Sequence, residues 1–192
     1  MCTKDDIITL PNKHLRQKSQ RISVVSEETK KLIQNMIDAT LDWEASRPYE
    51  IGAALAAVQI DQLQRAVIVR SDFDDKTSQE FTTLINPKVV KYEGEIIKDY
   101  EGCLSVKDVY GYVPRYSKVR VKALDLDGNE IRIKAEGFLA RVLQHEIDHT
   151  NGTVFIDHIK EDPEAFFTLD EKGELTKLDY EKDIKASTVL WN

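Results

Sequence analysis

The sequence is poor in cysteine, has no long apolar run and carries no excess of positive charge. Its two cysteines, Cys2 and Cys103, could form one disulfide but not a disulfide framework, so a reducing compartment is expected. No apolar stretch is long enough to span a bilayer, and residues 1–6 lead into no apolar signal segment, so the expected location is the cytoplasm. The net charge of −7 argues against broad binding to nucleic acid or anionic membranes, although it leaves room for a local basic surface.

The length and the apolar patterning predict a single domain over residues 1–192, with residues 161–192 as a charged C-terminal extension. Apolar residues at helical spacing after Ser26 predict an N-terminal amphipathic helix over 27–44. A second helix is expected over 137–150, and it is apolar over so wide an arc that it should be buried. Between the helices, strands are expected near residues 66–70, 81–85, 88–97, 118–126 and 130–134. The predicted fold is α+β, with antiparallel sheets packed around the second helix.

The clearest chemical signal is the run His145-Glu146-Ile147-Asp148-His149 in the second helix. Residues four apart lie on one helical face, so His145 and His149 can direct ring nitrogens at one metal ion. Glu146 is rotated by about 100° from His145, which places its carboxylate beside the metal as a base for water. The alternative without a metal is that these are surface histidines on a core helix. The rarity of the motif and the helix stop at Asn151-Gly152 favour the metal site.

A catalytic site of this kind requires a third protein ligand and one open position. Downstream of the helix the single histidine is His158, and Phe155 occupies the last histidine position of the longer protease motif HExxHxxGxxH. Both facts weaken the interpretation as a protease. Cys103 is the other candidate. A lone cysteine is more often a small buried hydrophobe, but one that follows Gly102 in a polar segment is less easily explained in that way. A thiolate would suit ferrous iron or zinc.

Three segments, in the same order along the chain, resemble the motifs of the peptide deformylase family. Residues 52–59 (GAALAAVQ) resemble its GxGLAAxQ motif, residues 101–105 (EGCLS) resemble EGCLS, and residues 145–149 (HEIDH) resemble HExDH. The resemblance runs from about residue 14 to residue 160. It implies an enzyme that hydrolyses the N-formyl group from the N-terminal formylmethionine of newly made polypeptides and releases formate.

The resemblance also implies roles for individual residues. The implied ligands of one divalent metal ion are Cys103, His145 and His149. Fe(II) is the usual metal of the family, and Zn(II), Ni(II) or Co(II) can occupy the same site. Glu146 would act as general base and then as the acid that protonates the leaving amine. The side-chain amide of Gln59 and the backbone N–H of Leu104 would stabilise the oxyanion.

By the same resemblance, the substrate peptide pairs with an extended segment, and an apolar pocket receives the methionine side chain. The expected substrate-binding residues are Gly52, Ala53, Ala54, Glu101, Phe138 and Val142. Glu101 and Arg115 are expected to form a supporting ion pair, and Asp148 either orients a metal ligand or caps local backbone. Ala54 is a departure, because the family has its second glycine there. Glycine would permit a positive φ or a close approach of the backbone to substrate.

Two other functions fit the same residues. A metallo-amidase or protease of other specificity would share the metal site but would not release formate from a formyl peptide. The second alternative is a deformylase-like protein that binds formylated peptides but hydrolyses them only weakly, and Ala54 is the feature that supports it. A binding module without metal would contain no ion after anaerobic purification. The expected partners are N-formylmethionyl peptides, including nascent chains at the ribosome, with no nucleic acid and no membrane.

Overall fold

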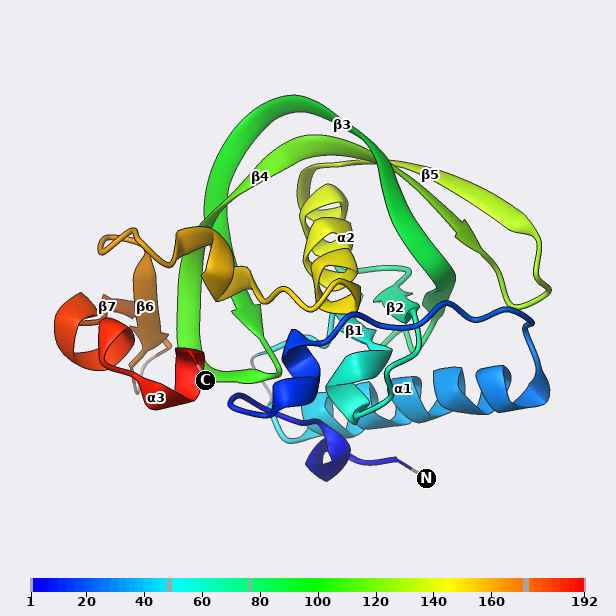
Figure 1. The fold of residues 1–192 in the computed structure, drawn as a ribbon, viewed down its shortest axis with the longest axis horizontal. Helices are drawn as coiled ribbons and strands as arrows, with labels where there is room; N and C mark the ends of the chain where they lie inside the picture. Colours follow the sequence, from blue (N-terminus) through cyan, green and yellow to red (C-terminus); the bar gives the residue numbers. More distant parts are fainter. Residues whose placement is uncertain (1, 48–49, 76, 171–172, 192) are drawn as a thin grey trace.

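The computed structural model describes residues 2–47, 50–75, 77–170 and 173–191, which fold into one antiparallel sheet and a few helices (Figure 1). The sheet has the strand order β1-β2-β3-β4-β6-β7, and β5 pairs with β4. The strands are β1 (Ala54–Ala56), β2 (Ala66–Arg70), β3 (Phe81–Cys103), β4 (Val106–Leu124), β5 (Glu130–Glu136), β6 (Phe166–Leu169) and β7 (Leu175–Lys177). The expected α+β class is confirmed. The strands expected in separate sheets form one sheet in the described part, because β3 and β4 are long enough to join all the others.

Strands β3 and β4 form a long hairpin that arches over the helix α2 (Gly137–Thr150) (Figure 1). They contain 23 and 19 residues, whereas most strands have about 3–10. The register of the pair shifts at several points, including between Glu93 and Ile96, where Gly94 has a φ of +76°. Such bulges bend a ribbon and increase its twist, which allows the hairpin to curve. Cys103 pairs with Val106 at the closed end of the hairpin.

Helix α1 (Glu27–Ala45) begins and ends close to the predicted range. The Ser26 hydroxyl accepts a hydrogen bond from the N–H of Thr29, and two glutamates in the first turn suit the positive end of the helix dipole. The helix buries Leu32, Ile33 and Met36 in a cluster with apolar residues of β1 and β2. It therefore supports, from outside, the strand that precedes Gln59.

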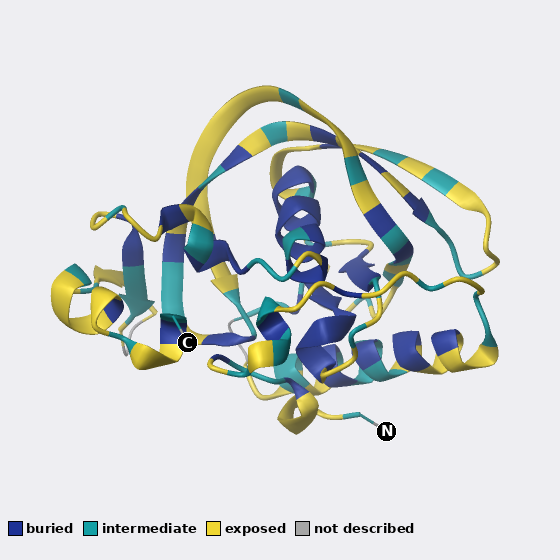
Figure 2. Ribbon diagram, in the orientation of Figure 1, coloured by how far each residue is buried: buried dark blue, intermediate teal, exposed yellow. Residues whose placement is uncertain are grey.

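Helix α2 occupies the predicted range and is buried over most of its surface (Figure 2). It follows β5 directly, with Gly137 at a φ of +60°. It ends at Asn151 and Gly152, and Gly152 has a φ of +79°. A Cβ atom at Gly152 would lie 2.7 Å from the carbonyl oxygen of Arg16, so the close approach of the N-terminal segment requires glycine here.

The described residues after 161 dock onto the end of the sheet. Strands β6 and β7 extend it beyond β4, and a π-helix (Tyr180–Lys185) and the short helix α3 (Thr188–Trp191) follow. Phe166, Ile184 and Leu190 are buried in one cluster with Leu15 and Phe155. Short 3-10 helices cover Lys4–Asp6, Lys13–Arg16, Ala57–Ile60 and Phe155–Ile159. Among the described residues, no helix combines the length and the apolar character needed to cross a membrane.

Candidate metal centre

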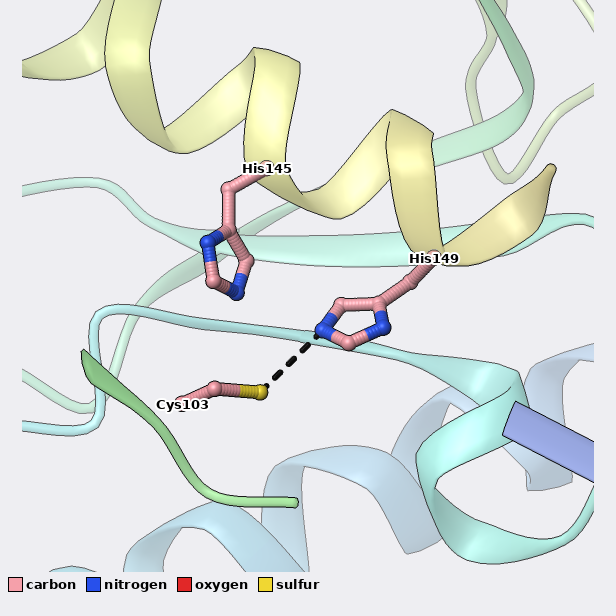
Figure 3. A group of neighbouring side chains, drawn as sticks. All are labelled: Cys103, His145 and His149. Carbon is pink, nitrogen blue, oxygen red and sulfur yellow. Dashed lines mark hydrogen bonds between the residues drawn. The ribbon is translucent and has the colours of Figure 1, made fainter. Parts of the chain in front are cut away.

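Cys103, His145 and His149 meet where the end of β3 approaches the second half of α2 (Figure 3). Their ligand atoms all lie within 4.8 Å of one another, and Cys103 Sγ is 3.2 Å from His149 Nε2. The histidine rings, one helical turn apart, have centroids 5.0 Å apart, and Figure 3 shows one nitrogen of each ring turned toward the sulfur. One thiolate and two imidazoles form a donor set that suits zinc or ferrous iron. The residues present therefore fit a metal ion.

Glu101 fixes the orientation of the His145 ring. Its Oε2 atom lies 2.9 Å from His145 Nδ1, which leaves Nε2 as the ring nitrogen for a metal. Arg115 donates to both carboxylate oxygens of Glu101, at 2.9 and 3.0 Å, and Arg141 donates to Oε1 at 2.7 Å. The expected ion pair between Glu101 and Arg115 is present. Both oxygens of Glu101 already have partners, so this carboxylate is better suited to positioning His145 than to binding a peptide.

The Asp148 carboxylate bonds to Arg115 and His158 and not to a metal ligand. It forms a short ion pair with Arg115, and its Oδ2 atom lies 2.7 Å from His158 Nε2. Asp148 is therefore linked to His145 indirectly, through Arg115 and Glu101. This arrangement is neither the direct contact with a metal ligand nor the backbone cap that the sequence led us to expect. His158, the downstream histidine weighed as a third ligand, is held by this pair and is absent from the group that contains Cys103.

The surrounding charges set the protonation of these groups. Burial raises the pKa of Glu101, but hydrogen bonds and charge from His145 and Arg115 outweigh it and hold that pKa well below its usual range. Burial lowers the pKa of His149, and the positive charge of His145 lowers it further. For His145, burial lowers the pKa, but Cys103 and Glu101 raise it above its ordinary value. His149 is thus kept neutral, which is the form that binds metal.

Glu146 lies beside the two histidines and lines the cavity next to them. Its side chain is buried, and its Oε2 atom has no hydrogen-bond partner among the described residues. Burial raises the pKa of Glu146 to about 7. A carboxyl group with a pKa near neutrality can both accept and return a proton at physiological pH.

Gln59 and Leu104, the expected oxyanion donors, both line this cavity. Gln59 Oε1 accepts the N–H of Ala56 at 2.9 Å, so its amide nitrogen faces the other way. That nitrogen lies 3.1 Å from Ser105 Oγ and 3.6 Å from Cys103 Sγ. The structure therefore holds the amide donor of Gln59 on the cysteine side of the site, and Leu104 directly follows that cysteine.

The cavity has a volume of about 280 Å³ and opens onto the metal centre. Ala53, Ala54, Phe138 and Val142 line it, as expected for substrate contacts. Gly52 is not part of the lining. Its N–H donates to Glu44 at 2.9 Å and its carbonyl accepts from Arg70 at 3.2 Å, so both backbone groups already have partners.

Ala54 lies in β1 opposite Val69 and belongs to the apolar core. It is not among the described residues with a positive φ. The conformational reason for a glycine at this position therefore does not apply to this chain. The other reason for glycine, a close approach of the backbone to substrate, still applies, because the alanine methyl adds bulk at the edge of the cavity.

Two participants were missed by the sequence analysis. Arg141 binds Glu101 and also donates to the carbonyl of Val113 at 2.9 Å. A signal for Arg141 was available, because it is a charged residue in an apolar helix, four positions before His145 and therefore on the same face. Ser105, the partner of Gln59, was marked only by its place at the end of the EGCLS segment, which assigns its side chain no role.

Known proteins resemble this chain over most of its length. The family model described as "Polypeptide deformylase" matches residues 4–164. A peptide deformylase of Thermomicrobium roseum is 43% identical over 171 residues, covering 88% of this chain and 93% of the relative. A solved peptide deformylase of Legionella pneumophila has a TM-score of 0.72 and 37% identity, covering 82% of this chain and 86% of that one.

A further solved structure, from Ehrlichia chaffeensis, is a peptide deformylase in complex with actinonin. It has a TM-score of 0.69 and 35% identity, and the match covers 82% of this chain and 88% of that one. The sequence and structural matches agree with the family that the three motifs resemble. The chain therefore belongs to the polypeptide deformylase family, the hydrolases that remove the N-formyl group from polypeptides.

Proposed function

We propose that Cys103, His145 and His149 bind one divalent metal ion and that this chain deformylates peptides at that site. The observation that carries the proposal is the convergence of the three ligand atoms within 4.8 Å, beside a cavity that Cys103, His145 and Glu146 line. The antiparallel sheet and the buried helix with the HEIDH run supply the scaffold. We assign the whole of residues 1–192 to one catalytic domain, with residues 161–192 as its C-terminal extension.

Fe(II) is the metal we propose, with Zn(II), Ni(II) or Co(II) as functional substitutes. The two cysteines are free thiols, and a thiolate with two imidazoles suits all of these ions. A ferrous thiolate site is sensitive to oxidation, which agrees with a reducing location such as the cytoplasm. The metal content of anaerobically purified protein tests this assignment.

We assign the proton transfers to Glu146. When bound, the metal would polarise the formyl carbonyl and lower the pKa of a water molecule. Glu146 would take the proton of that water and later deliver it to the leaving amine, for which a pKa near 7 is well matched. The Gln59 amide and the Leu104 N–H would donate hydrogen bonds to the developing oxyanion.

The substrate would lie along Ala53 and Ala54, with its methionine side chain against Phe138 and Val142. The short strand β1 has one partner strand, β2, among the described residues, so no strand occupies its other edge, where an extended peptide would pair next to the Ala56 N–H that donates to Gln59. We propose N-formylmethionyl peptides as substrates, including nascent chains.

The test is formate release from a formyl-methionyl tripeptide by anaerobically purified, Fe(II)-loaded protein. The matched control is the acetyl-methionyl tripeptide, which differs from the substrate by one methyl group. We expect turnover of the formyl peptide and little turnover of the acetyl peptide, because the methyl group of the acetyl peptide crowds the carbonyl carbon that water must attack. Equal turnover of both peptides, or cleavage of an internal bond, would indicate a metallo-amidase or protease instead.

A further inference from the structure

A second cavity lies at the C-terminal end of α2 and shares no lining residue with the cavity at the metal centre. Its volume is about 400 Å³. Four segments form it: the N-terminal stretch, the residues before β2, the start of β3 and the end of α2. The lining residues with charged or polar side chains are Lys18, Ser19, Arg21, Arg65, Asn86, Lys88, Tyr92 and Asn151.

The charge of this lining is entirely positive. It contains four cationic side chains and no aspartate or glutamate, in a chain with 34 acidic and 27 basic residues. Lys18, Arg21, Arg65 and Lys88 form no ion pair within the part of the chain that the structure describes. Asp148, whose charge reaches Tyr92, is already paired with Arg115 and His158. Clustered cations without a counter-charge favour binding of an anion.

Among these four cations, Arg65 has its side chain held in place by hydrogen bonds. Its guanidinium donates to the carbonyls of Pro87, at 3.0 Å, and Thr150, at 3.2 Å, and to Asn151 Oδ1 at 2.9 Å. These bonds cap the end of α2 and explain why Arg65 is present. Burial lowers the pKa of Arg65, and the neighbouring charge of Arg21 lowers it further. Among the residues that the structure describes, the side chains of Lys18, Arg21 and Lys88 make no comparable bonds.

Ser19 is a second and independent sign of a ligand. It lines the cavity and is 4% exposed, and its hydroxyl has no hydrogen-bond partner among the described residues. A buried hydroxyl without a partner is unfavourable and is rare in native proteins. A bound oxyanion would form ion pairs with the surrounding cations and, after rotation of the buried Ser19 side chain toward it, would accept a hydrogen bond from this hydroxyl.

We propose that this cavity binds the phosphate group of a small phosphorylated molecule. Arg21 supplies a guanidinium with no bond to another described residue, Arg65 supplies the Nη2 donors that its bonds to Pro87, Thr150 and Asn151 leave over, Lys18 and Lys88 add charge, and Ser19 adds a neutral donor. The cavity is large enough for more than the phosphate group, and the half-exposed ring of Tyr92 forms part of its wall. A phosphate ester with a planar ring, such as a nucleotide, would use both features.

The test is calorimetric titration of the full-length chain with inorganic phosphate at constant ionic strength. The test variant is the double substitution Lys18→Ala with Lys88→Ala. Its matched control is Lys31→Ala with Lys134→Ala, which removes two other exposed lysines that lie outside the cavity and form no ion pair in the described part. We expect saturable binding that weakens about tenfold in the test variant and is unchanged in the control. Formate release should stay unchanged in both variants, so the result is independent of the proposed catalytic function.

A third variant, Ser19→Ala, separates a binding role from a structural one. Without phosphate it should be at least as thermostable as the parent, because it removes an unpaired hydroxyl. With phosphate it should bind more weakly. A parallel titration with adenosine monophosphate, in the parent and in Tyr92→Leu, distinguishes a nucleotide ligand from free phosphate. No saturable phosphate binding by the parent, or equal loss in the test and control variants, would overturn the proposal.

Discussion

Helix α2 contacts two polar clusters that differ in charge balance. The first, here the Glu101 network, comprises Glu101, Arg115, Arg141, His145, Asp148 and His158, and its charged atoms are paired with one another. The second, here the Lys18 cavity, has four cations and no acid in its lining. Glu101 and Arg115 are buried, whereas Lys18 and Lys88 are exposed.

The difference indicates what each cluster is built to do. In the Glu101 network the protein supplies both signs of charge, so its geometry is fixed before any ligand arrives and it can hold His145 in place. In the Lys18 cavity the opposite charge is missing, so a ligand is needed to supply it. Removal of one charge should therefore destabilise the first cluster strongly and the second hardly at all.

The largest effect is expected for Glu101→Gln. This substitution leaves Arg115 and Arg141 buried without their shared counter-charge, and loss of one partner from a buried ion pair costs about 3–5 kcal/mol. The free energy of unfolding, measured by urea titration, should fall by that amount, and metal affinity should fall because His145 loses its partner. A change below 1 kcal/mol would mean that the network behaves as a solvated surface cluster.

A second prediction concerns Glu146, which lies beside the network and whose Oε2 atom has no hydrogen-bond partner in the described part of the chain. Its pKa is about 7 in the folded chain and 4.5 ordinarily, so between these values the folded state holds a proton that the unfolded state releases. The stability of chelator-treated protein should therefore fall as pH rises from about 4.5 to about 7, by roughly 3 kcal/mol. Glu146→Gln is the control, since it lacks the titrating group. Parallel pH profiles of the two proteins would show that Glu146 is not perturbed.

A third prediction extends the comparison to another buried pair. Arg70 is fully buried, is paired with Glu44 and donates to the carbonyl of Gly52. Arg70→Met should cost about 2 kcal/mol, less than the loss of Glu101, because Glu44 is partly exposed. It should also raise KM more than it lowers kcat, since Gly52 leads into the strand proposed to bind substrate. An unchanged KM would separate this pair from substrate binding.

The smallest effect is expected in the Lys18 cavity. Without phosphate, Lys18→Ala and Lys88→Ala should each change the free energy of unfolding by less than about 0.5 kcal/mol, because exposed unpaired charges contribute little. Denaturant titration of each variant beside Glu101→Gln provides the direct contrast. A loss comparable to that in Glu101→Gln would mean that these lysines have structural partners.

The sequence predicted the parts of the site that depend on local spacing. The pair of ligands on α2 follows from helical periodicity, and the proximity of Cys103 rested on the motif resemblance. The bond between Glu101 and His145 could not be predicted from spacing, because it joins residues 44 apart and depends on the path of β3 past α2. The short strands expected within β3 and β4 are parts of two long, continuous strands. Bulges interrupt the alternation of apolar and polar residues along them, so the sequence pattern did not show that the strands continue.

The Lys18 cavity shows the limit more clearly. Its four cations come from residues 18, 21, 65 and 88, and no local pattern links them. The overall charge of −7 does not reveal such a site, because a net charge conceals a local excess of one sign.

The most direct test of the central claim measures formate release and metal content on the same anaerobic preparations of the parent and of Glu146→Gln. With Cys103, His145 and His149 as ligands and Glu146 as the proton carrier, the variant should retain about one metal ion per chain, as one such site requires. Its turnover should fall by roughly 10²- to 10⁴-fold. Undiminished turnover in the variant, or no formate release from the metal-loaded parent, would contradict the account.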